Sequence, residues 1–586
     1  MINEHLKGLQ AEITSKNLDL YYMNTSDYHC SEYVPEYFKT IAYFTGFTGS
    51  LATLLVSRND AYIFVDGRYH TQADKQCIPN GVKVIKLGTR GALDPVDFIK
   101  AYYPNAIIGL DGKRTTISFV KALLNENIKI KSIDIYSHLI KDRAPLKKDK
   151  IFELENKYTG LPRSKKLSLI KYVLKGRIHI VNNLESIAYI LNLRSNDILY
   201  TPVFMSYLVF VGKNVYLFVD KNRFDYKTID NLYADGIIIR PYDSYYDFIS
   251  MINKSTILLD ENKNNYETYV RINEHNNKII NKRSLIEDMK SIKNNLEQEN
   301  SKRAHIYDGI SMLRFLMWIN SIDKSTVNEY EVAQKINEFR LNYKASDLSF
   351  ESIVAYNENS AIIHYAPEKE NSKQLDNYGV LLLDTGGQYL LGTTDITRTI
   401  ALGPVDDEVK KHFTLVLKSM FNLSEAKFIK GITGNQLDIL ARKDLWAQGL
   451  DYRHGTGHGV GHYLSVHEGP PNVRYMKNGS NADVEIKPGM IFSDEPGVYF
   501  EGKYGIRCEN LVLCKSDYEN EYGEFLKFET LTLVPFDVNL IDKNYLDENT
   551  INILNEYHKH IYETLLPYLN EEEANYLRKL TEAIWK

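Results

Sequence analysis

The chain has 586 residues and a mass of 67.7 kDa, so it is several times longer than a typical domain of about 100–200 residues. Hydrophobic residues make up 44% of it, charged residues 25%, and the mean hydropathy is -0.35, which excludes an integral membrane protein and a mostly disordered one. The net charge is -5, whereas most nucleic-acid binders carry an excess of basic residues. We therefore expect a folded, multidomain protein with no nucleic-acid or membrane partner.

Four cysteines are spread along the chain, too few for a disulfide framework and without the C-x-x-C pair of a thiolate zinc site: Cys30, Cys77, Cys508 and Cys514. This usage favours a reducing compartment. Residues 1–20 predict a short polar helix rather than a targeting segment, and no stretch approaches the roughly 18 apolar residues of a membrane span. We expect a cytoplasmic protein.

Two similar patterns occupy the first half of the chain. In the first, the apolar β-type runs LDLYYM, LATLLVS and AYIFVDG alternate with helical periodicity, which predicts an α/β domain over residues 1–145. The proline and lysines of residues 143–150 predict a linker, with a basic binding patch as the alternative. The runs VYLFVD, GIIIR and STILLD then predict a second α/β domain of related plan over residues 146–286.

The pattern changes near residue 287 to a long amphipathic helix, with an apolar stripe at Ile306, Ile310, Leu313 and Met317. Glycine-containing, strand-rich segments follow over residues 349–535, and a helical tail covers residues 551–586. The tail either caps this domain or joins a dimer. The predicted fold class is therefore multidomain α/β and α+β, with a third domain over residues 287–586.

An apolar strand ends at Asp384, and a second strand begins near Asp395 after several glycines. A turn near Tyr389 and Leu390 would pair the two strands and bring both carboxylates to one face. Two carboxylates in apolar surroundings repel each other, so this arrangement requires a cation between them. The alternative is a pair of turn aspartates that face solvent.

Four histidines follow in the segment HGTGHGVGHYLSVHEGPP, namely His454, His458, His462 and His467. Four glycines lie between the first three histidines, and glycine disfavours a regular helix. An H-x-x-x-H zinc helix is therefore a poor interpretation of this segment. Histidine is the commonest neutral metal ligand and can transfer protons near neutral pH. The segment therefore predicts imidazoles aimed at a site, although a structural role is the alternative for each.

Two further carboxylates lie in or beside apolar β-type runs, Glu495 in MIFSDEPGVYF and Glu509 in YGIRCENLVL. An unpaired glutamate there carries a large desolvation cost. Either could instead pair with a neighbour such as Arg507.

Four acids and one imidazole make an oxygen-rich ligand set: Asp384, Asp395, Glu495, Glu509 and His458. Such a set suits Mn²⁺, Mg²⁺ or Zn²⁺, and four acids can bridge two ions about 3.5–4 Å apart. Two ions lower the pKa of a bridging water and polarise the carbonyl that the resulting hydroxide attacks. The sequence therefore predicts a dinuclear hydrolase site.

The ordered set D…D…H…E…E, with HGTGHGVG, VHEGP, DEPGVY and GIRCEN, resembles the pita-bread metallopeptidases, most closely the aminopeptidase P family. The segments SEYV, FTGFTGS, VDGRYHTQA, LNLRSNDILYTPVFMSY and LSFESIVAYNENSAIIHYAP resemble its long, three-domain cytosolic form, so the resemblance covers nearly the whole chain. It implies two creatinase-like N-terminal domains before a pita-bread catalytic domain. It also implies removal of an N-terminal residue that precedes proline, by a homodimer with two divalent ions, Mn²⁺ by preference and Zn²⁺ as the alternative.

The resemblance assigns roles to the five ligands. Asp384 would be a terminal ligand of one metal, and Asp395 and Glu509 would bridge both ions. His458 and Glu495 would complete the other metal, with Glu495 also acting as general base toward the bridging water.

Further residues match groups of the family outside the metal ligands. His364, His454 and His467 would orient substrate, hold the tetrahedral intermediate and transfer protons. Arg507 would fix the adjacent bridging carboxylate, and His462 has no assigned role beyond packing or hydrogen bonding.

In the N-terminal domain, Glu32 and Arg68 match residues that face the substrate cleft, and Glu32 would hold the free amino group of the peptide, across a dimer interface in one arrangement. A surface salt bridge is the alternative for each. The alternative functions are a prolidase that cleaves only dipeptides and an inactive peptide-binding protein; creatinase-like and methionine aminopeptidase chemistry fit the three-domain length less well.

Overall fold

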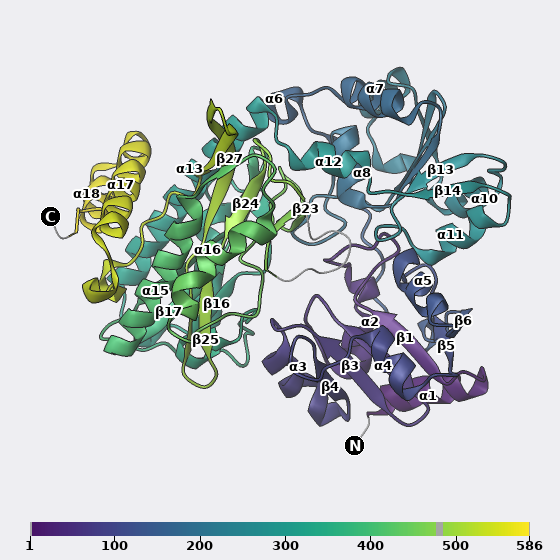
Figure 1. Cartoon of the computed structure of the whole chain (residues 1–586), viewed down its shortest axis with the longest axis horizontal. Coiled ribbons are helices and arrows are strands. Elements are labelled where there is room, and N and C mark those ends of the chain that lie inside the picture. Colours follow the sequence, from purple (N-terminus) through teal and green to yellow (C-terminus); the bar gives the residue numbers. More distant parts are fainter. Residues whose placement is uncertain (1–2, 476–483, 585–586) are drawn as a thin grey trace. The chain divides into compact units, whose positions relative to one another are not determined.

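The computed structural model describes residues 3–475 and 484–584. The chain divides into two compact units, Met1–Glu287 and Asp288–Lys586 (Figure 1). In Figure 1 the colours run from purple to teal through the first unit and from teal to yellow through the second.

The first unit begins with a six-stranded sheet in the order β4-β3-β2-β1-β5-β6. Its strands are β1 Leu20–Asn24, β2 Thr53–Ser57, β3 Ala61–Val65, β4 Lys83–Lys86, β5 Ile107–Leu110 and β6 Lys129–Ser132. Its helices are α1 Glu4–Ser15, α2 Thr40–Thr45, α3 His70–Cys77, α4 Pro95–Tyr102 and α5 Ile117–Asn125. Alternate residues of β1 enter different cores: Tyr21 packs with α1, α2 and α3, and Tyr22 with α4 and α5. Both faces of this sheet are therefore covered, as the continuous apolar runs predict.

A second six-stranded sheet in the same unit repeats this plan in the order β12-β11-β10-β8-β13-β14. Its strands are β8 Ile178–Val181, β10 Tyr207–Val211, β11 Asn214–Phe218, β12 Ile237–Arg240, β13 Thr256–Leu259 and β14 Lys278–Asn281, and a short pair lies apart, β7 Phe152–Glu153 with β9 Leu193–Arg194. The helices are α6 Asn156–Thr159, α7 Arg163–Leu174, α8 Leu184–Leu191, α9 Tyr226–Ala234, α10 Tyr245–Ser250 and α11 Tyr266–Asn273, while α12 Leu285–Ser291 crosses the boundary between the units.

The two sheets have the same pattern of parallel and antiparallel neighbours from edge to edge. The related plan of the two N-terminal regions is thus confirmed. Residues 143–150 contain neither helix nor strand, as expected of a linker. The domain boundaries 1–145, 146–286 and 287–586 stay predictions.

The second unit combines long helices with small antiparallel sheets. The helices are α13 Asn295–Ser321, α14 Glu329–Leu341, α15 Asp407–Ser424, α16 Gly434–Trp446, α17 Glu548–Leu565 and α18 Glu571–Leu580. One sheet has the order β16-β17-β20, formed by Ile353–Tyr356, Val380–Thr385 and Ile396–Ala401. A six-stranded sheet has the order β21-β28-β27-β24-β22-β23, formed by Lys427–Ile429, Gly523–Thr530, Asn510–Asn520, Ile491–Asp494, Gly457–Gly459 and Glu468–Val473.

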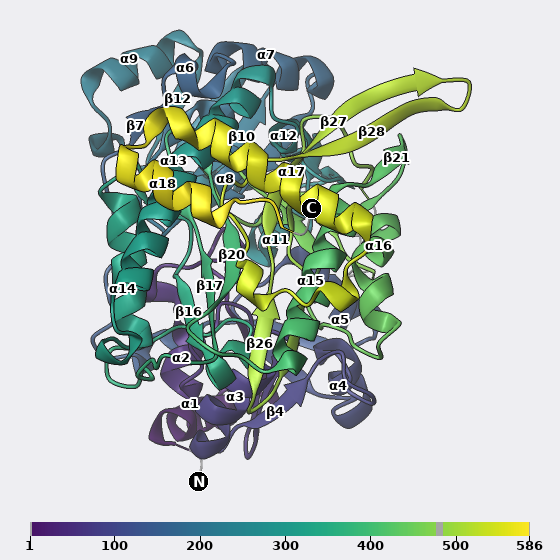
Figure 2. The same cartoon turned by 90° about the vertical axis from the view of Figure 1, so that its left-hand side faces the viewer.

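Smaller strands complete the second unit: β15 Asp347–Leu348 and β19 Gly392–Thr393 flank β18 Gly387–Tyr389, and β25 Gly497–Phe500 pairs with β26 Tyr504–Arg507. The C-terminal helices α17 and α18 lie side by side and pack on α13 (Figure 2). Leu554, Ile561 and Leu577 from these helices are buried in the core of this unit. The helical tail therefore caps the second unit.

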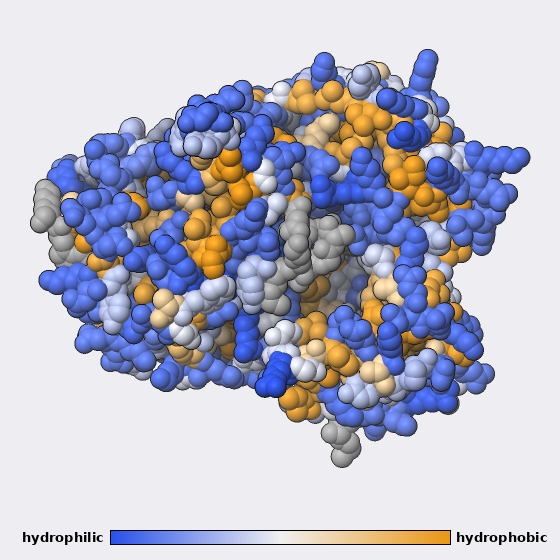
Figure 3. Space-filling view, in the orientation of Figure 1, coloured by the Kyte–Doolittle hydropathy of each residue, from blue (hydrophilic) through white to orange (hydrophobic). Residues whose placement is uncertain are grey.

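The face of the molecule in Figure 3 carries mainly hydrophilic side chains, with separate hydrophobic patches between them. Among the residues that the structure describes, no helix is both long enough and apolar enough to span a membrane.

Candidate metal centre and active site

The first two predicted ligands lie on neighbouring strands of the small sheet. Asp384 is near the end of β17, and Asp395 immediately precedes β20. In the antiparallel register Asp384 faces Thr397, so Asp395, two residues before Thr397, is a diagonal neighbour on the same face. Asp384 is 7% and Asp395 4% exposed. The alternative of turn aspartates that face solvent is therefore wrong.

The other three predicted ligands come from the six-stranded sheet. His458 is the central residue of β22, Glu495 directly follows β24, and Glu509 directly precedes β27. Because Asp494 pairs with Asn510 in the antiparallel register of β24 and β27, Glu495 and Glu509 come opposite each other one step beyond that pair. The backbone N–H of Glu509 also donates to the carbonyl of Thr397 at 3.2 Å, which joins the two sheets at the site.

The glycines around His458 let three strands approach closely. A Cβ atom on Gly457 would lie 1.8 Å from the carbonyl oxygen of Ser493 in β24, and one on Gly459 would lie 2.3 Å from the carbonyl oxygen of Glu468 in β23. Only glycine avoids these clashes. Residues 457–459 thus form a strand between two others, and the segment forms no zinc helix, as predicted.

The imidazole of His458 is oriented for ligation. Its Nδ1 lies 2.9 Å from the carbonyl oxygen of Gly459, which can only accept, so Nδ1 carries the proton. Nε2 then presents a lone pair 3.4 Å from Oδ2 of Asp395 and 3.5 Å from Oε1 of Glu495. His458, Asp395 and Glu509 each place one donor atom within 4.8 Å of the others.

The electrostatics of the site call for cations. Oδ1 of Asp384 and Oε1 of Glu509 are buried without a hydrogen-bond partner among the described residues. Burial, followed by the charge of Asp384, raises the pKa of Asp395 well above its usual value, and burial with the charge of Asp395 does the same to Glu509. Burial also raises the pKa of Glu495 to about 7. Four oxygen donors and one nitrogen donor with unsatisfied oxygens fit hard or borderline divalent ions.

Arg507 contacts a different carboxylate from the one expected. Its Nη2 donates to Oδ2 of Asp384 at 2.6 Å, not to Glu509. The chain leaves β26 at Arg507 and enters β27 at Asn510, so Glu509 lies in the connection between two sheets. Arg507 reaches Glu509 through Thr397, whose hydroxyl accepts from Nε at 3.2 Å and donates to Oε2 of Glu509 at 2.7 Å.

Thr397 and Tyr499 are site residues that sequence reasoning missed. Asp395 and Thr397 alternate in DITRT at the strand period of two, and this spacing was the available signal for the threonine. Tyr499 links two predicted residues, since its hydroxyl lies 2.8 Å from Nε2 of His454 and 2.8 Å from Nη1 of Arg507. Nothing in the spacing of EPGVYF indicates this link.

The remaining histidines differ in their surroundings. His467 lies with its ring edge-on to that of His458, with ring centroids 4.4 Å apart. His364 is half-buried in the loop after β16, next to Ile363, whose carbonyl oxygen accepts from Nη2 of Arg507 at 3.4 Å. His462 is buried with Nδ1 3.4 Å from the hydroxyl of Ser301 in α13, in keeping with the packing or hydrogen-bonding role expected of it.

Glu32 and Arg68 belong to the first unit. Arg68 is bound by Asp66, with Nη2 2.8 Å from Oδ2, and Glu32 is near enough for its charge to act on Arg68. Arg68 therefore has the salt bridge that was its alternative role, and a substrate role for either residue stays a prediction.

Family models match consecutive parts of the chain. Residues 5–143 and 142–297 each match a creatinase/prolidase N-terminal domain, residues 299–516 match metallopeptidase family M24, and residues 524–584 match the C-terminal region of that family. The predicted fold class, two creatinase-like α/β domains before a pita-bread domain, is confirmed.

Curated relatives and a solved structure match nearly the whole chain. The chain is 34% identical to a probable Xaa-Pro aminopeptidase P of Talaromyces stipitatus, over 99% of this chain and 92% of the relative. It is 33% identical to Xaa-Pro aminopeptidase 1 of Dictyostelium discoideum, over 98% and 96%. A crystal structure of X-prolyl aminopeptidase from Caenorhabditis elegans, described as a cytosolic enzyme with a di-nuclear active site, matches with a TM-score of 0.93 and 31% identity over 99% of both chains. With this site, these domains and these relatives, the chain belongs to the Xaa-Pro aminopeptidases of metallopeptidase family M24.

Proposed function

We propose that this chain releases the N-terminal residue from peptides whose second residue is proline. Proline lacks the backbone N–H and has a fixed φ, so the bond before it needs a dedicated site. The observation that carries the proposal is the meeting of four carboxylates, three of them buried, with Nε2 of His458. Among the described residues, one oxygen of Asp384 and one of Glu509 are buried without a hydrogen-bond partner. Such a group of acids has a clear use as a cation site and a high cost otherwise.

We propose that Asp384, Asp395, His458, Glu495 and Glu509 hold two divalent ions. When bound, the ions lower the pKa of a bridging water, supply a hydroxide nucleophile at neutral pH and polarise the scissile carbonyl. Mn²⁺ is the proposed metal, with Zn²⁺ as the alternative, because both suit four oxygens and one imidazole nitrogen. The proposal includes a cytoplasmic location, as the C. elegans relative is described as cytosolic. It also includes a homodimer, which rests on the family resemblance of the sequence alone.

Within this scheme each residue of the chain has a distinct task. Glu495, held by the Ser493 hydroxyl at 3.1 Å, takes the proton of the attacking water. Arg507 and Thr397 hold Asp384 and Glu509 in place. The remaining tasks, orienting the peptide and transferring protons to the leaving proline nitrogen, fall to three histidines: His364, His454 and His467.

A peptide panel tests the proposal. The Mn²⁺-loaded protein should release the first residue of a tripeptide with proline in second place and leave the matching alanine tripeptide intact. Turnover of the dipeptide alone would indicate a prolidase, and binding without turnover an inactive peptide-binding protein.

On the same panel Glu32→Ala should raise KM for the free tripeptide, because Glu32 is expected to hold the amino group of the peptide. An unchanged KM would remove Glu32 from amino-group recognition.

We expect His454→Ala to lower kcat about 100-fold while metal content stays at the wild-type level. The reason is its geometry: Nδ1 of His454 contacts the Gly455 carbonyl at 2.8 Å, so Nε2 is left to accept from the hydroxyl of Tyr499. Arg507 donates to that same hydroxyl, so His454 contacts the Tyr499–Arg507 pair rather than a proposed ligand. Steady-state kinetics with elemental analysis checks this, with the exposed His560→Ala as control. A parallel loss of metal would make His454 a ligand.

A further inference from the structure

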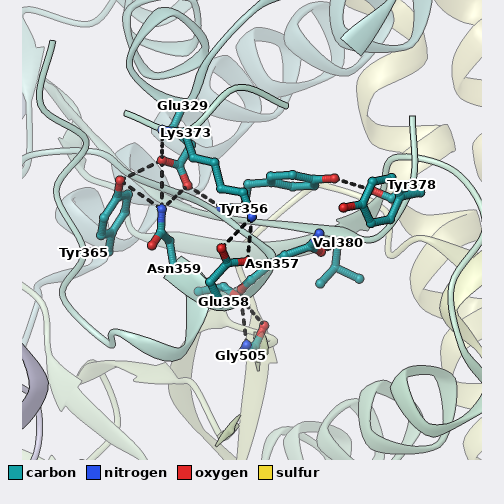
Figure 4. A network of polar contacts seen from close by, with 11 residues as sticks. Glu329, Tyr356, Asn357, Glu358, Asn359, Tyr365, Lys373, Tyr378, Val380 and Gly505 are labelled. Atoms are coloured by element: carbon teal, nitrogen blue, oxygen red, sulfur yellow. Dashed lines mark hydrogen bonds and ion pairs between the residues drawn. The ribbon is translucent and has the colours of Figure 1, made fainter. Parts of the chain in front are cut away.

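Glu329 is a fully buried carboxylate at the first residue of α14, outside the proposed ligand set. Figure 4 shows it at the centre of a network of polar contacts. In the described parts of the chain, no side chain of lysine, arginine or histidine contacts its carboxylate, whose partners are backbone N–H groups and neutral side chains. A buried anion held in this way is costly unless each hydrogen bond is made.

The donors all come from the end of β16 or from residues 357–373, which we call the His364 loop. Oε1 of Glu329 accepts from the backbone N–H of Tyr356 at 2.7 Å and from Nδ2 of Asn359 at 3.0 Å. Oε2 accepts from Asn359 at 3.1 Å, from the hydroxyl of Tyr365 at 2.6 Å and from the backbone N–H of Lys373 at 2.9 Å. One carboxylate thus holds the start, the middle and the end of the loop (Figure 4).

The other contacts inside the His364 loop include short-range hydrogen bonds and an exposed ion pair, in which Nζ of Lys373 lies 2.6 Å from the carboxylate of Glu358. After the 3₁₀ turn Asn357–Ala361 the loop contains neither α-helix nor strand. Long irregular segments depend on such anchors for a single conformation. A second anchor lies on the catalytic side, where the hydroxyl of Ser360 accepts from the backbone N–H of Gly505 at 2.6 Å and donates to its carbonyl at 3.0 Å.

Gly505 lies in β26, two residues before Arg507. The loop therefore spans from the Glu329 anchor on α14 to the strand that carries the guanidinium of the site. Within it, Tyr365 bonds Glu329 on one side of His364, and the carbonyl of Ile363 accepts from Arg507 on the other. His364 is thus placed between two fixed points.

We propose that Glu329 is a positioning residue, which fixes the His364 loop and so aims His364 and the Ile363 carbonyl at the active site. The inference rests on the proposed function, because His364 acts on substrate only there. Glu329 touches no reacting group and acts through the loop.

Glu329→Gln tests this with little change in volume, since it replaces one accepting oxygen by an NH₂ group that faces donors. We expect kcat/KM for the proline tripeptide to fall about 10- to 100-fold, because small displacements of a catalytic group cost that much. Metal content should not change. In the His364→Ala background the same substitution should cause no further loss, because the loop no longer carries the imidazole.

Two further variants keep the test sharp. Glu331→Gln, on the same helix, keeps the capping acceptor for the Asn328 N–H and should behave as wild type. Tyr365→Phe removes a single hydrogen bond to Glu329 and should give a several-fold loss that is also absent in the His364→Ala background. If Glu329→Gln does not fold, Tyr365→Phe serves as the test in its place.

Hydrogen exchange gives a readout that does not depend on activity. In Glu329→Gln, amides of residues 357–373 should exchange faster while those of β17 and β20 stay protected; Glu331→Gln should change neither. Unaltered exchange in the loop, or losses of activity that multiply with that of His364→Ala, would overturn the inference. Wild-type cleavage of the tripeptide, measured first, tests the proposed function separately.

Discussion

Replacement of Asp395 by Asn is expected to abolish hydrolysis and to remove metal from the protein. Asp395 is the buried carboxylate nearest Nε2 of His458, and its pKa is raised by burial and by the charge of Asp384. The asparagine amide removes the negative charge and one donor oxygen from the side chain that both ions would share as a ligand. We expect kcat/KM to fall at least about 1,000-fold, since several kcal/mol of metal-derived stabilisation is lost.

Elemental analysis of the purified variant and kinetics on the proline tripeptide check this result. Asp407→Asn, an exposed position in the first turn of α15, is the control and should keep wild-type metal content and rate. An Asp395→Asn protein that still holds two ions and turns over substrate would refute the dinuclear site.

Replacement of Glu495 by Gln is expected to lower kcat by about 100- to 10,000-fold, the usual contribution of a general base. The side chain lies beside Nε2 of His458 and is held by the Ser493 hydroxyl, so the amide occupies the same position without accepting a proton. Glu501→Gln in the exposed turn between β25 and β26 is the control. A rate equal to the wild type would leave the general base elsewhere.

The pH dependence of metal binding should change with the same variant. Burial is the largest cause that raises the pKa of Glu495 from 4.5 to about 7, so in the metal-free protein a proton must leave when an ion binds, and affinity should fall as pH drops through about 7. Because the pKa of Glu495 is higher in the folded state, its protonated form stabilises the metal-free protein below the ordinary pKa of glutamate. This contribution to the free energy of unfolding is lost as pH rises through about 7. Metal titrations and melting curves at pH 5–8 should show flatter profiles for Glu495→Gln.

Much of the local structure could be predicted from the sequence because it depends on the spacing of apolar residues over short stretches of the chain. The runs LDLYYM and VYLFVD became β1 and β11, and the apolar stripe from Ile306 to Met317 became α13. The five candidate ligands could also be proposed from the sequence: the four carboxylates because a charged residue beside an apolar strand is costly without a partner, and His458 because of its glycine-rich segment.

What the sequence could not provide was contact between strands that are distant along the chain. The opposition of Glu495 and Glu509 depends on the register of β24 and β27, and the position of Asp384 beside Arg507 depends on how two separate sheets meet. Neither is a local property. For the same reason the links through Thr397, Tyr499 and Glu329 became visible only in three dimensions.

The close approach at Gly457 sets a limit on how this protein can vary. With the Ser493 carbonyl 1.8 Å from where a Cβ would lie, even an alanine would force β22 away from β24 and carry the neighbouring imidazole with it. Glycine has no side chain to act in the site, yet this position does not tolerate substitution, because the spacing of the two backbones leaves no room for a Cβ. Homologous sequences that keep the five ligands but carry a side chain here should have lost tight metal binding.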